Sequence, residues 1–372
     1  MSFVKHYKLK IKILSPVHIG SGEIYEPTGY VIEKILQPSG KEIDALYEFD
    51  TMALYEILSE TDKEKFRDLV EASDENGLIK MQNFIFAHKK QGRQVAYKIV
   101  KVSPNAAQEY YDKIGKVVQK ESGKNNVINQ LEIYKCVSNK NQKRDSAILT
   151  GSSLKGAIST AYQELLVKKG VKYHDVRDLL LSPSDGNPFK NLLISDSGGL
   201  ASKIYSTANV KRELKNDDIK YNDSLSTRLE AIVSNVTCEI PLSIKQNSTE
   251  EPLDINRLIK ACNDHYEPIF RSLFNDDGVL ECLSEKFYKS YKDFGRSNLA
   301  PNQFLLRVGR HSGARAVTIE GEREISIKQG VGKNPIIKEA ETTTWLAKVK
   351  DQIEAGCVPF GWLLCEVNEI KS

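Results

Sequence analysis

The stretch ILTGSSLKGAISTAYQELL, from Ile148 to Leu166, decides the fold of this chain. After its glycine and serines the apolar residues recur at three-to-four spacing, which predicts a helix that begins near Ser152 or Ser153. A serine there caps the first free N–H groups, and Gly151 allows a sharp turn into the helix. The positive pole so formed, with Lys155 beside it, can seat a phosphate. The plainer interpretation, a well-capped helix after a strand, stays open.

The spacing of this stretch excludes one class of phosphate ligand. A nucleotide-triphosphate loop needs Lys-Ser or Lys-Thr directly after its second glycine. Here Ala157 follows Gly156, and the lysine comes before that glycine. A polymeric phosphate backbone fits better, because it requires only hydrogen-bond donors and positive charge.

The bulk composition is that of a folded protein without a membrane-spanning segment. A length of 372 residues predicts two domains, and 28% charged residues with 8% aromatic ones is ordinary for globular chains. No apolar run reaches the roughly 20 residues that span a bilayer, and the N-terminus lacks a signal-peptide pattern, so a cytoplasmic protein is expected. Six scattered cysteines without a Cys-x-x-Cys pair argue against a zinc site and against disulfides.

Positive charge is concentrated in one segment of the chain. Between Lys80 and Arg144 stand fourteen Lys and Arg and four acids, a local balance of +10 in a chain whose net charge is +3. Such segregation favours an anionic polymer as partner. A solvated basic face explains the same pattern, and the sequence leaves both interpretations open.

The order of strands and helices predicts an α+β fold. Strands flank helices twice, without the strict alternation of a doubly wound sheet, which fits two ferredoxin-like (RRM-type, split βαβ) domains. We expect an N-terminal domain from residues 1–50 and 146–245, a helical, basic insertion over 51–145, and a C-terminal domain over 246–372.

Several individual elements can be predicted from periodicity and capping signals. Tyr7–Leu14 alternates lysine with apolar residues as a strand does, and a helical pattern starts at Asp50 or Thr51. Further predictions are weak helices at 106–119 and 127–136, helices within 254–274 and 278–294, and strands within 227–245, 302–310, 316–320 and 358–370.

Two more glycine-containing turns follow apolar strands, PVHIGSG and LLRVGRHSGARAV. The second has no acid from Leu305 to Thr318, and its arginines could grip phosphates or stack on unpaired bases. A nearby Trp362 is either a core anchor or a base-stacking residue. No catalytic motif or metal-ligand spacing appears, so we expect no catalytic residue, metal or cofactor. His18 or His311 could serve as a general base in an enzyme.

Together, PVHIGSG, GSSLKGAISTA, VGRHSGA and the terminal ETTTWL…VPFGW resemble the RAMP superfamily of CRISPR proteins. Within it they are most similar to the Csm-type, type III-A subunits that cap the 3′ end of the CRISPR RNA (crRNA). The resemblance implies a non-catalytic RNA-binding protein whose partners are crRNA, the backbone RAMP subunit, the small subunit and cellular nucleases that trim the guide. The RNA-binding residues it and the glycine turns suggest are His18, Gly20, Gly22, Ser152, Ser153, Lys155, Arg307, Arg310, His311, Gly313 and Arg315.

The sequence departs from this family pattern at two places. Relatives often carry Arg where this chain has Ser159, so one phosphate contact is in doubt. The stretch EIYEPTGYVIE lacks the Asp with which backbone subunits cut target RNA. Two alternatives remain, a metal-independent endoribonuclease that processes precursor crRNA and a target-cleaving backbone subunit.

Overall fold

The N-terminal strand lies at the centre of a five-stranded antiparallel sheet. In the computed structural model β1 spans Phe3–Ile13, and the strand order is β14-β19-β1-β13-β9. Leu9, Ile11 and Ile13 are fully buried, while the lysines between them are exposed, so the predicted alternation is confirmed. The other strands are β9 (Leu192–Ile194), β13 (Thr237–Gln246), β14 (Gln303–Arg307) and β19 (Trp362–Glu369).

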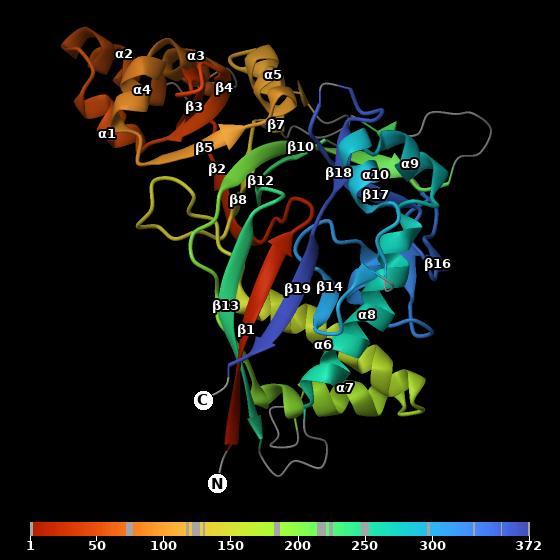
Figure 1. Cartoon of the computed structure of the whole chain (residues 1–372). Helices are drawn as coiled ribbons and strands as arrows, with labels where there is room; N and C mark the ends of the chain where they lie inside the picture. Colours follow the sequence, from red (N-terminus) through yellow and green to blue (C-terminus); the bar gives the residue numbers. More distant parts are fainter. Residues whose placement is uncertain are drawn as a thin grey trace.

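Two long helices cover one side of this sheet. Figure 1 shows α6 (Gly151–Lys168) and α8 (Ile255–Ser272) on one side of strands β1, β13 and β19. Their apolar stripes and the sheet form the largest core cluster, as the three-to-four spacing of both segments predicts. The further helices of this part are α7 (Tyr173–Leu181), α9 (Asp277–Cys282) and α10 (Glu285–Tyr291).

A larger mixed sheet makes the second layer. Its path is β2-β8-β12-β10-β5-β4-β3. The strands β11 (Tyr221–Asn222) and β17 (Thr343–Lys348) pair with β10, and β18 (Cys357–Pro359) pairs with β17. The pairs β10–β5 and β12–β8 are parallel. The strands of the path are β2 (Gly20–Tyr25), β3 (Tyr30–Leu36), β4 (Glu42–Glu48), β5 (Lys98–Val102), β8 (Ile133–Cys136), β10 (Ser202–Lys211) and β12 (Arg228–Ile232).

Helices of the 51–145 segment cover both faces of the β3–β4 end of this sheet. The helices α1 (Thr51–Glu56), α2 (Glu60–Glu71), α3 (Gly77–Ala87) and α4 (Lys89–Val95) pack on one face, and α5 (Pro104–Lys113) packs on the other. Asp50 caps α1, as predicted. Figure 1 shows α1–α4 at the end of the molecule far from both chain termini. Two small sheets pair β6 (Gln119–Lys120) with β7 (Val127–Ile128) and β15 (Ile325–Ile327) with β16 (Ile336–Lys338).

The structure describes residues 3–71, 77–116, 119–120, 127–128, 131–181, 187–213, 221–222, 226–246, 253–295, 298–329, 332–350 and 352–370. The mixed α+β class expected from the sequence is confirmed. The strand pairing, however, does not divide at residue 246, because β14 and β19 share the five-stranded sheet with β1. The 51–145 segment is also not purely helical, since it supplies β5 and β8 to the large sheet.

Two local predictions were wrong. The stretch 127–136 contains the strands β7 and β8 instead of a helix, because Ile133 and Tyr134 pair with β2 and β12; residues 129 and 130 lie outside the described part. The expected strand over 316–320 begins inside a single 3₁₀ turn, Ala314–Val317, which packs against α6 and α8. In both places tertiary contacts override local pattern. None of the helices described is long and apolar enough to cross a membrane.

Candidate nucleic-acid interface

The helix predicted from the opening stretch begins at Gly151, and a threonine caps it instead of a serine. Thr150 Oγ1 accepts a hydrogen bond from the backbone N–H of Ser153 at 3.4 Å, and Asp196 Oδ1 accepts one from Gly151 N–H at 2.8 Å. Gly151 is required for close packing, since a Cβ there would overlap the carbonyl oxygen of Ile194. Asp196 therefore already accepts one of the free N–H groups of this helix end and offsets part of its positive charge.

Lys155 lies one turn into α6 and borders a small cavity. The cavity has a volume of about 210 Å³, and Ser159, Phe189 and Lys190 also line it. Burial lowers the pKa of Lys155, and no carboxylate lies within ion-pair distance of it among the described residues. The exposed Ser152 and the half-buried Ser153 flank the same helix start, so this end of α6 offers one uncompensated cation and two hydroxyls.

The first and third glycine turns contact each other through their backbones. The N–H of Arg310 donates to the carbonyl oxygen of His18 at 2.8 Å. Gly309 adopts φ +83°, and a Cβ on it would clash with that same oxygen. The final motif joins them, because Gly361 N–H donates to the carbonyl oxygen of Pro16 at 2.8 Å. The three stretches thus form one structural unit.

His18 supports this unit from the inside. Its side chain is 1% exposed, and Nδ1 lies 2.6 Å from the carbonyl oxygen of Glu230. Burial lowers the pKa of His18, which favours the neutral ring. Gly20 lies close enough that a Cβ would come 3.1 Å from His18 Nε2, while Gly22 adopts φ +85° in open space. His18 is therefore a packed residue beneath the loop.

A buried carboxylate that the sequence did not single out holds the strands under the loop. Glu230 is fully buried, and its Oε2 accepts from Tyr25 Oη at 2.7 Å and from Lys98 Nζ at 3.0 Å. Its Oε1 accepts from Ser202 Oγ at 2.6 Å. The backbone N–H of Cys136 donates to Oε2 at 3.3 Å. Residues of β2, β5, β8 and β10 are thus tied to β12. A lone Glu in a strand carries no signal of this role in the sequence.

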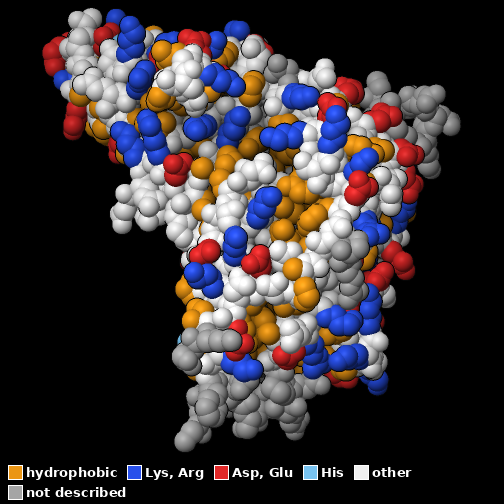
Figure 2. Space-filling model, viewed as in Figure 1, with side chains coloured by type: hydrophobic (Ala, Val, Ile, Leu, Met, Phe, Trp, Pro, Cys, Tyr) orange, Lys and Arg blue, Asp and Glu red, His pale blue; other side chains and the backbone are white. Residues whose placement is uncertain are grey.

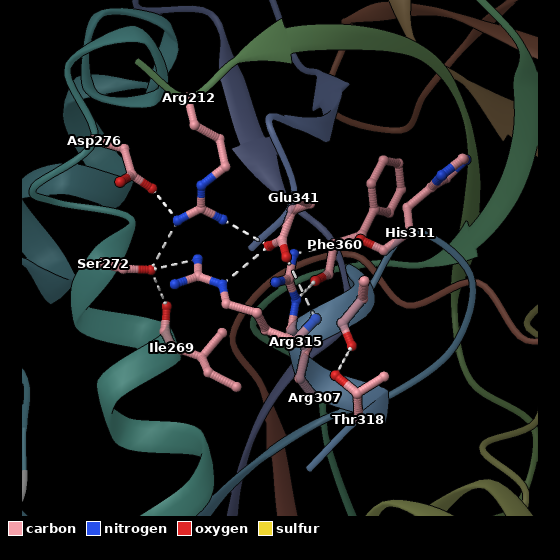
Figure 3. A network of polar contacts seen from close by, with 11 residues as sticks. Arg212, Ile269, Ser272, Asp276, Arg307, His311, Arg315, Thr318, Glu341 and Phe360 are labelled. Atoms are coloured by element: carbon pink, nitrogen blue, oxygen red, sulfur yellow. Dashed lines mark hydrogen bonds and ion pairs between the residues drawn. The ribbon is translucent and has the colours of Figure 1, made fainter. Parts of the chain in front are cut away.

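Arg307 is an internal brace, which argues against its predicted contact with RNA. It is 2% exposed, its Nε donates to the carbonyl oxygen of Phe360 at 3.1 Å, and one Nη donates to that of His311 at 3.3 Å. The guanidinium lies 5.1 Å from the ring centroid of Trp362, which is fully buried and so is a core anchor. Burial lowers the pKa of Arg307 to about 9. Figure 3 shows Arg307 together with Phe360 and His311, whose carbonyl oxygens accept these hydrogen bonds.

Arg315 is also internally paired. Figure 3 shows Glu341 accepting hydrogen bonds from Arg315 at 3.2 Å and from Arg212 at 2.7 Å. Arg212 also pairs with Asp276, and Ser272 Oγ accepts from both arginines. The network locks the third turn to α8 and α9. The positive charge of Arg315 is therefore compensated, and RNA contact by this side chain would have to compete with Glu341.

His311 packs into the protein with its backbone in the left-handed region, at φ +66°. Its ring centroid lies 5.0 Å from that of Trp345 and 5.4 Å from that of Phe360. Burial, reinforced by Arg310, lowers the pKa of His311 to about 3. Gly313 adopts φ +81° beside Arg307, which continues the tight turn.

Arg310 alone of the three arginines in this turn points outward. Its side chain is exposed, and its guanidinium lies 4.0 Å from the ring centroid of Tyr134 on β8. No carboxylate of the described residues lies within ion-pair distance of it. Of the predicted site residues, Arg310 and Lys155 are thus the cations that are not fully buried and have no carboxylate partner in the described part of the chain. Sequence reasoning missed Tyr134, because a single tyrosine in a basic segment gives no signal.

Neither a metal centre nor a disulfide is found among the described residues. No group of three or more His, Cys, Asp or Glu in that part could hold a metal ion, and none of the six cysteines forms a disulfide.

The fold is similar to that of a chain in a solved structure. That structure is described as "Cryo-EM structure of Csm-crRNA-target RNA ternary complex in type III-A CRISPR-Cas system". The superposition has a TM-score of 0.59 and 17% sequence identity, and it covers 97% of this chain and 100% of the other. No protein-family model and no curated protein matches the sequence. The likeness establishes a fold shared along nearly the whole of both chains.

Proposed function

We propose that this chain is a subunit of a type III-A Csm effector complex that binds the crRNA near its 3′ end and does not cut it. The fold shared with a chain of a Csm–crRNA–target RNA complex supports this proposal, as does the order of glycine motifs that resembles 3′-capping subunits. The partners are then crRNA, the backbone RAMP subunit and the small subunit.

The observation that carries the proposal is the state of Arg310. Its backbone is fixed by the carbonyl oxygen of His18, yet its guanidinium is exposed on Tyr134 without a carboxylate among the described residues. A guanidinium held in this way presents its N–H groups to phosphate oxygens in a defined direction. Lys155 on α6 adds a second cation without a carboxylate partner among the described residues.

The two histidines that could act as general bases support binding over cleavage. His18 is 1% exposed, and burial lowers the pKa of His311 to about 3. A base that acts near neutral pH needs access to a 2′-hydroxyl and a pKa near the working pH. Neither histidine meets both conditions in this structure.

The proposal is tested by measuring affinity for single-stranded RNA over a salt series. About six phosphate contacts would weaken binding roughly 10³-fold between about 50 and 200 mM salt. Arg310→Ala and Lys155→Ala should each weaken binding and lower the salt slope by about one. Lys169→Ala, at the opposite end of α6, serves as the matched control and should bind as the wild type does. Affinity that stays flat with salt would refute the mechanism.

Two further readouts separate the alternatives. Precursor crRNA incubated with the chain in chelator should stay intact, and cleavage that depends on His18 would favour the endoribonuclease instead. Tagged chain purified from cells should carry small RNAs that share a 5′ repeat tag and differ at their 3′ ends. Recovery of RNAs without that tag would refute the assignment to a Csm complex.

A further inference from the structure

A small cavity lies where the first turns of α6 meet the end of α7 and the 3₁₀ helix η1 (Pro188–Asn191). Its volume is about 210 Å³, which is several times the roughly 30 Å³ that one water molecule occupies in the liquid. This α6 cavity is lined only by residues that the structure describes. The side chains around it can therefore be compared with the chemistry of a ligand.

One side of the α6 cavity is cationic. The half-buried Lys155 and the exposed Lys190 both line it, and none of its described lining residues is an acid. Burial lowers the pKa of Lys155, so an anion in the cavity would stabilise its charged form. Ser159 Oγ also lines the cavity and accepts a hydrogen bond from Gln163 Nε2 at 3.4 Å. Among the contacts described, the O–H of Ser159 is still available to donate.

The other side of the α6 cavity is an apolar wall of Leu180 and Phe189. Phe189 packs edge-on against Tyr162, with their ring centroids 5.5 Å apart. The Asn187 amide fixes this wall, because its Nδ2 donates to the carbonyl oxygen of Leu180 at 2.7 Å and its Oδ1 accepts from the N–H of Phe189 at 2.9 Å. The wall is therefore already formed without a ligand, as is usual for small-molecule sites.

Gly156 keeps the α6 cavity open. It lines the cavity, and nothing lies within 4 Å of a Cβ added to it. A glycine inside a helix weakens that helix. Gly151, in the same motif, is needed for close packing against Ile194, but Gly156 has no such contact. The missing side chain at Gly156 therefore gives access to the cavity and serves no packing role among the described residues.

Exposed positive charge alone does not locate a binding site on this protein. Figure 2 shows Lys and Arg side chains at many places on the face that it presents. The α6 cavity differs because two lysines and a hydroxyl share one hollow with an apolar wall. Inorganic phosphate or an acidic side chain would use only the cationic side. A nucleotide uses both sides, since its phosphate is an anion and its base is largely apolar.

We propose that the α6 cavity is the binding site of one nucleotide of the RNA strand, with its phosphate on the two lysines and its base against the apolar wall. This inference rests on the proposed RNA-binding function and deepens it. It adds Lys190 to the RNA-binding residues, which sequence reasoning missed because a single lysine in a turn gives no signal.

The first test measures the affinity of the full chain for a labelled single-stranded RNA of about 20 nucleotides. Lys190→Ala should weaken binding about three- to tenfold and lower the salt slope by about one, and Lys190→Arg should restore most of the affinity. Lys169→Ala, at the far end of α6, is the matched control for charge.

The second test fills the space and leaves the charges in place. Gly156→Leu should weaken RNA binding about fivefold or more, because the leucine occupies part of the cavity. Its urea midpoint should not fall, since leucine is the better helix former. Thr160→Leu is the matched control, because Thr160 lies on α6 but does not line the cavity.

The third test identifies the ligand by acetylation of lysines, read by mass spectrometry. RNA should protect Lys155 and Lys190 and leave Lys169 reactive. Uridine 5′-monophosphate should protect the same two lysines at lower concentration than inorganic phosphate does, because its base adds contacts with the wall. Equal protection by inorganic phosphate, or by an oligoglutamate peptide, would overturn the assignment to a nucleotide.

The outcomes separate this inference from the function beneath it. If Arg310→Ala weakens RNA binding but Lys190→Ala and Gly156→Leu do not, the cavity is excluded and RNA binding stands. Failure of the wild type to bind the RNA would overturn both proposals. Lys190 is exposed, so its replacement remains readable even if Gly156→Leu fails to fold.

Discussion

Gly151, the first residue of α6, lies against Ile194 of β9 so closely that a Cβ on Gly151 would overlap the Ile194 carbonyl oxygen. The contact joins the helix to the edge strand of the five-stranded sheet at the point where the helix enters the core. Gly156, five residues further along the same helix, has nothing within 4 Å of an added Cβ. The two glycines of one motif therefore have opposite structural roles.

This difference predicts opposite effects of the same substitution. Gly151→Ala should lower the free energy of unfolding by about 1–3 kcal/mol, because overpacking against backbone forces the helix to shift. Gly156→Ala should raise it by roughly 0.5–1 kcal/mol, because alanine is the better helix former. Urea unfolding of both variants checks the pair. An unchanged midpoint for Gly151→Ala would contradict the close packing.

The long elements could be predicted because each shows one regular buried face. The alternation of β1 and the helical spacing of α6 and α8 are local patterns that the core simply uses. The large sheet could not be predicted in this way. Its strand β8 pairs with β12, almost 100 residues later in the chain, and with β2, more than 100 residues earlier, and no local pattern indicates either partner. The pairing of β14 and β19 with β1 is another case, because the ladder partner of a strand is not encoded in the residues next to it.

The candidate site shows the same limit at the level of side chains. The sequence identifies Arg307 and Arg310 as equivalent members of one basic turn. In the structure β14 ends at Arg307, whose guanidinium packs over Trp362, while the positive φ of Gly309 turns Arg310 outward onto Tyr134. Only the packing distinguishes the brace from the available cation.

The contact between the first and third turns predicts a linked loss of stability and binding. Gly309→Ala should lower the free energy of unfolding by about 1–2 kcal/mol because of the left-handed backbone, and by more because of the clash with the carbonyl oxygen of His18. Because the shift displaces Arg310, the variant should also bind RNA more weakly. Gly321→Ala is the control, because Gly321 has φ +87° but open space around it. Gly321→Ala should lose only the stability that the left-handed backbone costs, and it should bind RNA as the wild type does. Equal losses of stability in the two variants would argue against the clash.

The buried pair of Glu164 on α6 and His265 on α8 predicts how the stability of the core depends on pH. Burial by itself would raise the pKa of Glu164, but hydrogen bonds and charges from His265, 2.8 Å away, and Lys168 lower it to about 2. Because the folded pKa lies below the unfolded value of about 4.5, the ionised carboxylate stabilises the fold above pH 4.5, and this contribution is lost as the pH falls toward 2.

Glu164→Gln should therefore lower the free energy of unfolding at pH 7 by roughly 3 kcal/mol and flatten its dependence on pH between about 4.5 and 2. Glu285→Gln is the control, because Glu285 forms an exposed pair with Lys289 and should change stability little at any pH. Urea midpoints across this pH range measure both. A wild-type curve that stays level below pH 4.5 would mean that Glu164 is not a buried anion.

The half-buried Lys203 predicts a variant that is more stable than the wild type. Burial, with Lys41 and Lys101 nearby, lowers the pKa of Lys203, so its charged form is disfavoured in the folded state. Lys203→Met should raise the free energy of unfolding at pH 7 by about 1 kcal/mol, and the gain should shrink as the pH rises and wild-type Lys203 loses its proton. Lys292→Met, on an exposed side chain, should give no such gain. Urea unfolding at neutral and alkaline pH decides the point: a gain in stability that stays constant as the pH rises would show that it does not come from removing the charge of Lys203.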